Sequence, residues 1–183
     1  MTTFTNWQLI LETGKTTTPE ALQLFDSLEP VDLEFMMGKW RGSGLDTSHP
    51  MDGLLEASDW YGKEFIDPET VHPLIFLGFG NKQLRVAPDL AAMKLVMKLP
   101  LFKRPFMKPL LKLLNNLLSN EQSQARLRMT EYRNKVSATM IYDRLPINDS
   151  FRKIDADTVL GLMDFKGLPQ PFFFVLRRDK SIS

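Results

Sequence analysis

The two histidines are the side chains of this sequence best suited to acid–base chemistry near neutral pH. His49 and His72 each precede a proline, and the chain contains no cysteine. Paired with a carboxylate such as Asp52 or Asp143, either imidazole could act as general acid or base on a hydrophobic substrate, and either could ligate a haem iron. We favour the simpler interpretation that both are ordinary loop or strand-end histidines, and keep the enzyme and the haem protein as alternatives.

Other chemistry-bearing patterns are missing. The sequence has no Gly-x-Ser-x-Gly elbow, phosphate-binding loop, dinucleotide fingerprint or His-Glu-x-x-His. Its remaining candidate carboxylates show no diagnostic spacing: Glu56, Asp59, Glu131, Asp143 and Asp164. Two histidines without cysteine make a poor zinc site. We therefore favour a binding protein over an enzyme, and predict no catalytic residue, no metal and no cofactor.

The composition favours one domain with one sizeable core. The chain has 183 residues, of which 43% are hydrophobic, including 13 Phe and 10 Met. Such side chains fill irregular cores and also line pockets for apolar ligands. The net charge of +1 gives no overall bias toward nucleic acid. With no cysteine, no secretory signal and no long apolar run, we expect a cytoplasmic protein.

Residues 90–120 differ from the rest of the chain. This segment contains no acidic residue but six cations: Lys94, Lys98, Lys103, Arg104, Lys108 and Lys112. Helical spacing predicts helices over 89–98 and 105–118, the second with a stripe of Leu110, Leu113, Leu114, Leu117 and Leu118. The segment could cover a pocket as a basic lid, contact an anionic (inner) membrane peripherally, or simply present a solvated face. The nearby aromatic residues are too few for nucleic-acid binding.

The remaining elements are mostly strands that must position these residues. Thr18-Pro19-Glu20 predicts the start of a helical region over 19–37, interrupted at Pro30. A further short helix is predicted over 52–61. Apolar alternation and turn residues predict strands over 39–45, 71–79, 83–87, 126–132, 136–143, 149–154, 158–164 and 171–178. Many short strands joined by turns are typical of an antiparallel barrel or sandwich.

Gly38-Lys39-Trp40-Arg41-Gly42 begins the first of these strands. Glycines at both ends allow a sharp bend and close backbone approach. Since strand side chains alternate, Trp40 faces opposite to its two basic neighbours. We interpret Trp40 as a plug in the core, with the floor of a ligand pocket as the alternative.

Two stretches of the sequence resemble a known family. The first comprises Met37–Gly42, His49-Pro50 and Asp52–Leu55, and the second comprises Leu127-Arg128, Glu131–Arg133, Ser137–Asp143, Phe151–Lys153, Gly161–Asp164 and Pro169–Phe173. Together they resemble the bacterial GXWXG proteins, whose C-terminal part is domain of unknown function 4334. More distantly, Gly-x-Trp at a first strand is similar to the start of lipocalins, fatty-acid-binding proteins and nitrobindins. That resemblance implies a calycin-like barrel that holds an apolar ligand or haem.

We therefore predict an α+β fold, mostly antiparallel β, in which a barrel or strongly curved sheet carries N-terminal helices and a helical insertion. Within one domain we expect an N-terminal arm (1–18), a GXWXG part (19–88), an insertion or lid (89–120) and C-terminal strands (121–183). The predicted ligand is a fatty acid or an anionic phospholipid such as phosphatidylglycerol, and the oligomeric state stays open. The predicted binding residues are Trp40, Phe76, Met93, Met97, Lys98, Lys108, Leu110, Leu114, Arg128, Met140, Tyr142 and Phe173.

Overall fold

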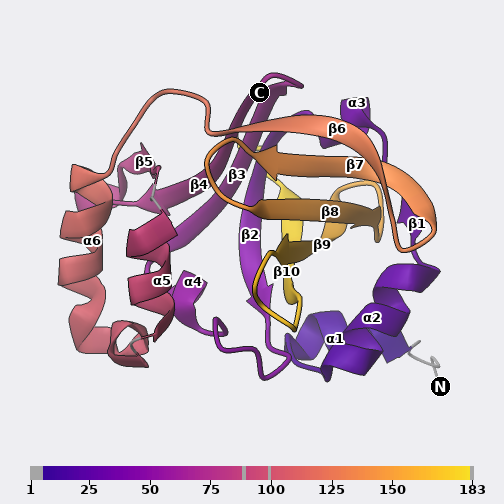
Figure 1. Ribbon diagram of the computed structural model, residues 1–183, viewed down its shortest axis with the longest axis horizontal. Helices are drawn as coiled ribbons and strands as arrows, with labels where there is room; N and C mark the ends of the chain where they lie inside the picture. The colour runs from indigo at the N-terminus through magenta and orange to yellow at the C-terminus, as the bar shows by residue number, and fades with distance from the viewer. Residues whose placement is uncertain (1–5, 88–89, 99, 182–183) are drawn as a thin grey trace.

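Eight antiparallel strands form a closed barrel in the computed structural model, which describes residues 6–87, 90–98 and 100–181 (Figure 1). The barrel strands are β2 (Gly38–Leu45), β3 (Trp60–Asp67), β4 (Thr70–Leu77), β6 (Ala125–Tyr132), β7 (Lys135–Tyr142), β8 (Ile147–Lys153), β9 (Thr158–Phe165) and β10 (Phe172–Arg178). Pairing of β8 with β9 closes the ring. The short strands β1 (Glu29–Pro30) and β5 (Gln83–Arg85) pair with β8 and β4. The predicted fold class is confirmed.

Local sequence explains the strand boundaries. Arg133 and Asn134 both adopt positive φ angles, of 51° and 61°, and form the two-residue turn between β6 and β7. Paired positive φ angles match the twist of a tight hairpin, and asparagine tolerates them well. The turn fixes the register in which Tyr132 lies opposite Lys135. The register in turn decides which side chains of the two strands face the barrel interior.

Trp40 closes one end of the barrel. Its side chain is fully buried, and its indole Nε1–H donates a hydrogen bond to the Met36 carbonyl at 2.8 Å. Met36 ends the short helix α3 (Leu33–Met36), and the ring of Phe35 from that helix lies 6.0 Å from the indole. The guanidinium of Arg178 stacks 4.2 Å from the indole centroid. Trp40 is thus fixed by packing, a hydrogen bond and a cation–π contact.

The N-terminal helices cover the outer surface of the barrel. Helices α1 (Asn6–Thr13) and α2 (Thr18–Ser27) pack on β2, β9 and β10, where the rings of Phe25 and Phe173 meet edge to face at 6.5 Å. Thr17 and Glu20 form a capping box at the start of α2, so the helix begins at Thr18, one residue earlier than the Thr18-Pro19-Glu20 pattern predicts. The predicted N-terminal arm (1–18) contains α1, whose buried Ile10 holds that helix against the barrel.

The predicted helix over 52–61 is mostly wrong. Helix α4 spans only Leu54–Ala57, and Trp60 is the first residue of β3. Asp59 has a φ of 55°, which a helix cannot continue through. The chain therefore turns at Asp59 and sends Trp60 into the core, where its large apolar surface is buried.

The basic segment forms a helical layer at the opposite side of the barrel from α1 and α2 (Figure 1). It consists of α5 (Leu90–Lys98), the 3₁₀ turns Pro100–Lys103 and Pro105–Met107, and α6 (Lys108–Leu117); another 3₁₀ turn, Phe79–Asn81, precedes β5. Backbone hydrogen bonds from Ala87 to Leu118 (3.2 Å) and from Asn120 to Arg85 (2.8 Å) tie its two ends to the sheet. None of the helices in the described ranges combines the length and the apolarity needed to cross a bilayer.

Candidate functional site

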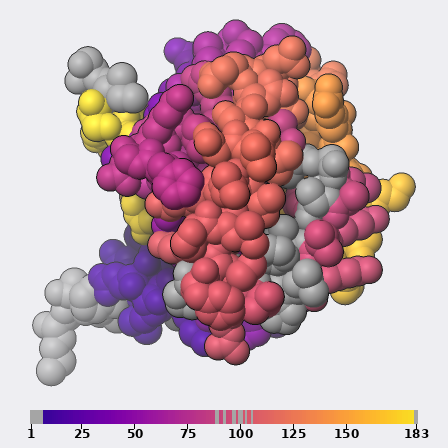
Figure 2. All heavy atoms as spheres, turned by 90° about the vertical axis from the view of Figure 1, so that its left-hand side faces the viewer, coloured from indigo at the N-terminus to yellow at the C-terminus, as the bar shows by residue number. Residues whose placement is uncertain are grey.

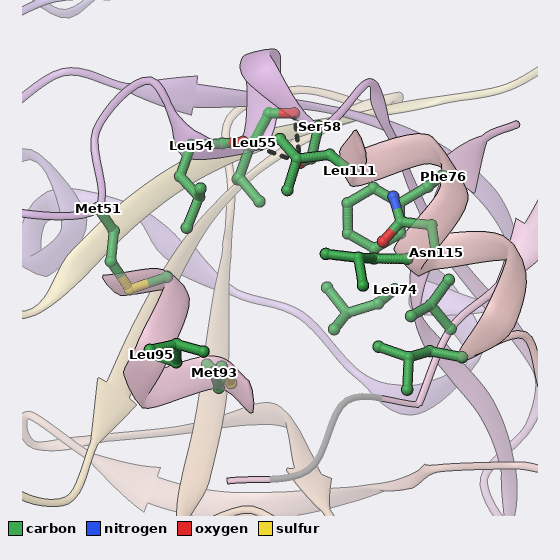
Figure 3. A pocket seen from close by; sticks show the side chains of 13 residues that line it. Met51, Leu54, Leu55, Ser58, Leu74, Phe76, Met93, Leu95, Leu111 and Asn115 are labelled. Atoms are coloured by element: carbon green, nitrogen blue, oxygen red, sulfur yellow. Dashed lines mark hydrogen bonds between the residues drawn. The ribbon is translucent and has the colours of Figure 1, made fainter. Parts of the chain in front are cut away.

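An apolar cavity of about 240 Å³ lies between this helical layer and the barrel. Its walls come from α4, β4, α5, α6 and the loop before α4, and their side chains converge on a common space (Figure 3). The lining residues are almost all Leu, Met, Phe or Val: Met51, Leu54, Leu55, Ser58, Leu74, Phe76, Val86, Met93, Leu95, Leu111, Leu114, Asn115 and Leu118.

Simple periodicities bring these residues together. Leu74 and Phe76 are two residues apart on β4, so the pleat turns both to the same face. On α6, Leu111, Leu114, Asn115 and Leu118 follow one another at helical spacing and form a single stripe toward the cavity. The cavity is therefore built by regular secondary structure and not by one irregular loop.

Two polar side chains line the cavity, and they differ in their hydrogen bonds. The Ser58 hydroxyl contacts the carbonyls of Leu54 (2.8 Å) and Leu55 (3.0 Å), so it is satisfied within its own turn. The Asn115 Nδ2 group is buried and has no hydrogen-bond acceptor in the described part of the chain. A buried unsatisfied donor costs about 1–3 kcal/mol. A hydrogen-bond acceptor on a bound molecule would remove that cost.

Positive charge borders the apolar stripe of α6. Lys108 and Lys112, one turn apart, both pair with the Asp59 carboxylate, at 2.7 Å and 3.2 Å. Desolvation opposes ionisation of Asp59, but hydrogen bonds from the two lysines outweigh it and hold the pKa of this carboxyl below its ordinary value. Two cations facing one anion leave this edge of the site with a net positive charge.

A second polar cluster lies inside the barrel. Lys63 Nζ and Asp149 Oδ2 are 2.8 Å apart, with side chains only 3% and 2% exposed. The ammonium also donates to the Pro73 carbonyl at 3.2 Å and lies 4.9 Å from the centroid of the Phe174 ring. The sequence does not predict this pair, because a lone Lys on β3 and a lone Asp on β8 give no sign that the barrel brings them together.

Burial shapes the electrostatics of this interior cluster. Desolvation raises the pKa of the Asp149 carboxyl, and Lys63 opposes the rise. Burial, aided by the nearby Asp149 charge, also raises the pKa of the Tyr142 phenol well above its ordinary value. The indole nitrogen of Trp60 and Asp149 Oδ1 have no hydrogen-bond partner among the described residues. Neither Lys63 nor Asp149 lines the apolar cavity, so the cluster is enclosed by barrel packing.

Neither histidine is arranged for the predicted alternatives. His49 is buried, with its Nε2 3.1 Å from the Gln170 carbonyl and its Nδ1 accepting from the Met51 amide at 3.0 Å. Both ring nitrogens are thus occupied by backbone, and Asp52 binds the backbone amide of His49, not its ring. His72 is buried on β4 and does not line the cavity. Neither histidine therefore faces the cavity together with a carboxylate, and the buried Nδ1 of His72 has no hydrogen-bond partner among the described residues.

Several predicted binding residues meet at the cavity or beside it. Phe76, Met93 and Leu114 line it, whereas Lys108 does not line it but pairs with Asp59, the neighbour of the lining residue Ser58. Lys98 is exposed at the end of α5. The side chain of Met97 lies outside the described part of the structure. The predicted residue Leu110 is 43% exposed and does not line the cavity, because the cavity-facing stripe of α6 runs through its neighbour Leu111.

The structure does not bring the other predicted binding residues to this cavity. Trp40 and Met140 are buried in the barrel core, and Phe173 lies on the outer surface under α2. Arg128 pairs with Glu69 at 2.5 Å. Tyr142 borders a separate small hollow beside Pro73. Strand alternation alone does not decide which face of a strand points inward.

Some cavity residues were not predicted, although a sequence pattern could have indicated them. Leu111, Asn115 and Leu118 share one helical face with Leu114, but the many leucines of α6 allow more than one apolar stripe. Leu74 could have been found from Phe76 by strand alternation. Met51 and Val86 come from irregular backbone, and no periodicity would have placed them at the cavity.

Comparisons with known proteins agree with this architecture. The family described as "GXWXG protein" matches residues 23–80, and "Domain of unknown function (DUF4334)" matches residues 123–178. A crystal structure of a protein from Thermomonospora curvata is similar, with a TM-score of 0.71 and 31% identity over 95% of this chain and 96% of that chain. No functionally curated protein matches. The chain belongs to the GXWXG family and carries its DUF4334 domain.

Proposed function

We propose that this protein binds a lipid-like amphipathic ligand, with an apolar chain in the cavity and an acceptor-bearing, anionic head at its charged edge. The observation that carries the proposal is the cavity itself. It is lined by Leu, Met, Phe and Val side chains and contains one buried donor, Asn115 Nδ2, without a partner in the described part of the chain. Apolar pockets with a few placed polar groups are the usual form of small-molecule sites.

The size of the cavity favours a ligand with a single acyl chain. Its volume of about 240 Å³ is larger than the roughly 150 Å³ cavity that holds benzene, and smaller than the roughly 300–1,000 Å³ typical of drug-sized ligands. A fatty acid fits this description. Of an anionic phospholipid such as phosphatidylglycerol, the cavity would take part of one acyl chain, and the remainder would stay outside.

The charged edge favours an anionic head group. Lys108 and Lys112 share the single carboxylate of Asp59, so a carboxylate or phosphate could recruit one of them without leaving Asp59 unpaired. Charge-assisted hydrogen bonds to such a head are about twice as strong as neutral ones. The apolar chain of the ligand supplies the affinity because its surface is buried in the cavity. The lysines select for a negatively charged head group.

The test is to identify what the protein carries. The protein would be expressed in bacteria, purified without detergent and extracted with organic solvent, and the extract analysed by mass spectrometry. The delipidated protein would then be titrated with dodecanoate by calorimetry. We expect a co-purifying single-chain or anionic lipid, and saturable binding of dodecanoate with a negative heat-capacity change. Finding no lipid in the extract together with no heat of binding would overturn the proposal.

A further inference from the structure

We infer that the outer face of the helical layer docks on an anionic lipid bilayer. On this face Phe106, Leu110, Leu113 and Leu117 are 68%, 43%, 48% and 73% exposed. We call these four residues, with the cations Lys94, Lys98 and Arg104, the docking face. Helix α6 runs down the middle of this side of the molecule in Figure 2, with α5 beside it.

Helical geometry separates the docking face from the cavity. Leu110, Leu113 and Leu117 follow at spacings of three and four residues and form one stripe on α6. The cavity stripe of Leu111, Leu114 and Leu118 is offset by one residue and lines the cavity, although Leu118 at its end is 38% exposed. Solvent exposure of several large apolar side chains in a row is unusual for a surface without a partner.

The charges of the segment identify the kind of partner. Residues 90–120 contain six cations and no acid. Lys108 and Lys112 are paired with Asp59, whereas Lys94, Lys98 and Arg104 form no ion pair with any described residue. Unpaired cations flanking an apolar stripe match the chemistry of an anionic membrane surface, where leucine and phenylalanine enter the acyl boundary and the cations meet the head groups.

A second copy of the chain is the less favourable occupant. A two-fold symmetric dimer would bring the same face of each copy together. That contact would place the cations of one copy against those of the other, and such like-charge pairs oppose association. A bilayer containing anionic lipid provides the apolar phase and the opposite charge at once.

Docking would give the cavity a source of ligand. Helix α6 would then contact the bilayer on one side and the cavity on the other, so displacement of α5 and α6 would connect the two. The supply of ligand from the bilayer to the cavity rests on the proposed function, but docking on the bilayer does not. A variant that fills the cavity, Leu114→Trp, should still bind vesicles, and this separates failure of one proposal from failure of the other.

The test is vesicle flotation of the full chain. The vesicles would consist of phosphatidylcholine alone or of phosphatidylcholine mixed with phosphatidylglycerol. Wild type should float with the mixed vesicles and much less with the neutral ones. Lys94→Glu/Lys98→Glu should weaken binding at least about twentyfold, at roughly fivefold for each charge removed. Phe106→Ser/Leu113→Ser/Leu117→Ser should abolish flotation while leaving the thermal transition in place, because all three side chains are exposed.

Matched controls lie elsewhere on the surface. Ile66 and Val136 are 53% and 54% exposed on other strands, and Ile66→Ser/Val136→Ser should float like wild type. Wild type that stays unbound with the mixed vesicles would overturn the inference. So would flotation that the serine variant leaves unchanged, or a dimer in solution that the same variant dissociates.

Discussion

The indole ring of Trp60 lies directly on the backbone of Gly42, the last residue of the Gly-Lys-Trp-Arg-Gly segment. A Cβ atom at position 42 would overlap three carbon atoms of that ring. The ring of Trp60 also meets Phe174 edge to face at 5.9 Å. The second glycine of the motif is therefore needed for packing between β2 and β3, and the motif explains the barrel core better than it explains a binding site.

Gly42→Ala should destabilise the protein by about 1–3 kcal/mol, because the added methyl group forces Trp60 out of its position. Chemical denaturation measures the change. Gly44→Ala on the same strand is the matched control. A Cβ there would meet mainly the end of the flexible Glu56 side chain, which can move aside. We expect the control to change stability by less than about 1 kcal/mol. Equal losses for the two variants would contradict this role of Trp60.

Replacing one partner of the Lys63–Asp149 pair should destabilise the protein much more than replacing both. Asp149→Asn leaves Lys63 charged and buried without its partner, and should cost about 3–5 kcal/mol. Asp164→Asn, an exposed carboxylate on the adjacent strand β9, should change stability little. Replacing both partners, as in Lys63→Met/Asp149→Leu, should recover most of the loss, since no unpaired charge remains. Denaturant unfolding of wild type and the three variants measures these changes in stability. A double variant as unstable as Asp149→Asn would show that the loss does not come from an unpaired buried charge.

The buried histidines predict a loss of stability at mildly acidic pH. Desolvation lowers the pKa of His49 and of His72 below the ordinary value of about 6.5. Between the folded and unfolded pKa values the unfolded chain binds more protons, so stability rises with pH through this window. The stability contributed by the neutral histidines should be fully present above about pH 6.5 and should fall as the pH drops below that value.

Thermal unfolding between about pH 7.5 and pH 5.5 tests this linkage. Wild type should show a falling transition temperature, and His49→Asn/His72→Asn a flatter profile, since these are the two histidines of the chain. Each single variant should fall in between. An unchanged slope in the double variant would mean that the imidazoles do not resist protonation in the folded state.

Asn115 should have opposite effects on stability and on binding. Asn115→Leu removes the unsatisfied Nδ2 donor and should stabilise the free protein by about 1–2 kcal/mol. The same change should weaken binding of a carboxylate ligand, because the donor that meets it is gone. The neighbouring exposed Asn116, replaced by Leu, serves as control and should do neither. A loss of stability in Asn115→Leu would show that the amide is satisfied in the native protein.

Much of the fold could be predicted from the sequence, because strand alternation and turn residues are local signals. The strand around Trp40, the start of α2 to within one residue and the hairpin at Asn134 all follow from short patterns. Strand β3 was not predicted at all; the expected helix over 52–61 covered its first residues, and the chain turns there at the positive φ of Asp59. The cavity could be predicted only in part, since the leucine-rich α6 offers several apolar faces and the barrel selects one.

The most direct test of the account is the dependence of affinity on ligand chain length. Saturated fatty acids of increasing length would be titrated into wild type, Leu114→Trp and Leu113→Trp. Leu114 lines the cavity, whereas Leu113, its neighbour on α6, is 48% exposed. For wild type and Leu113→Trp, affinity should rise by about 0.8 kcal/mol for each added methylene until the cavity is full, and then level off.

In Leu114→Trp the indole occupies the cavity, so affinity should be lower and should level off at a shorter chain. Binding that all three proteins share equally, or affinity that rises without a break at every chain length tested, would contradict a ligand site in this cavity.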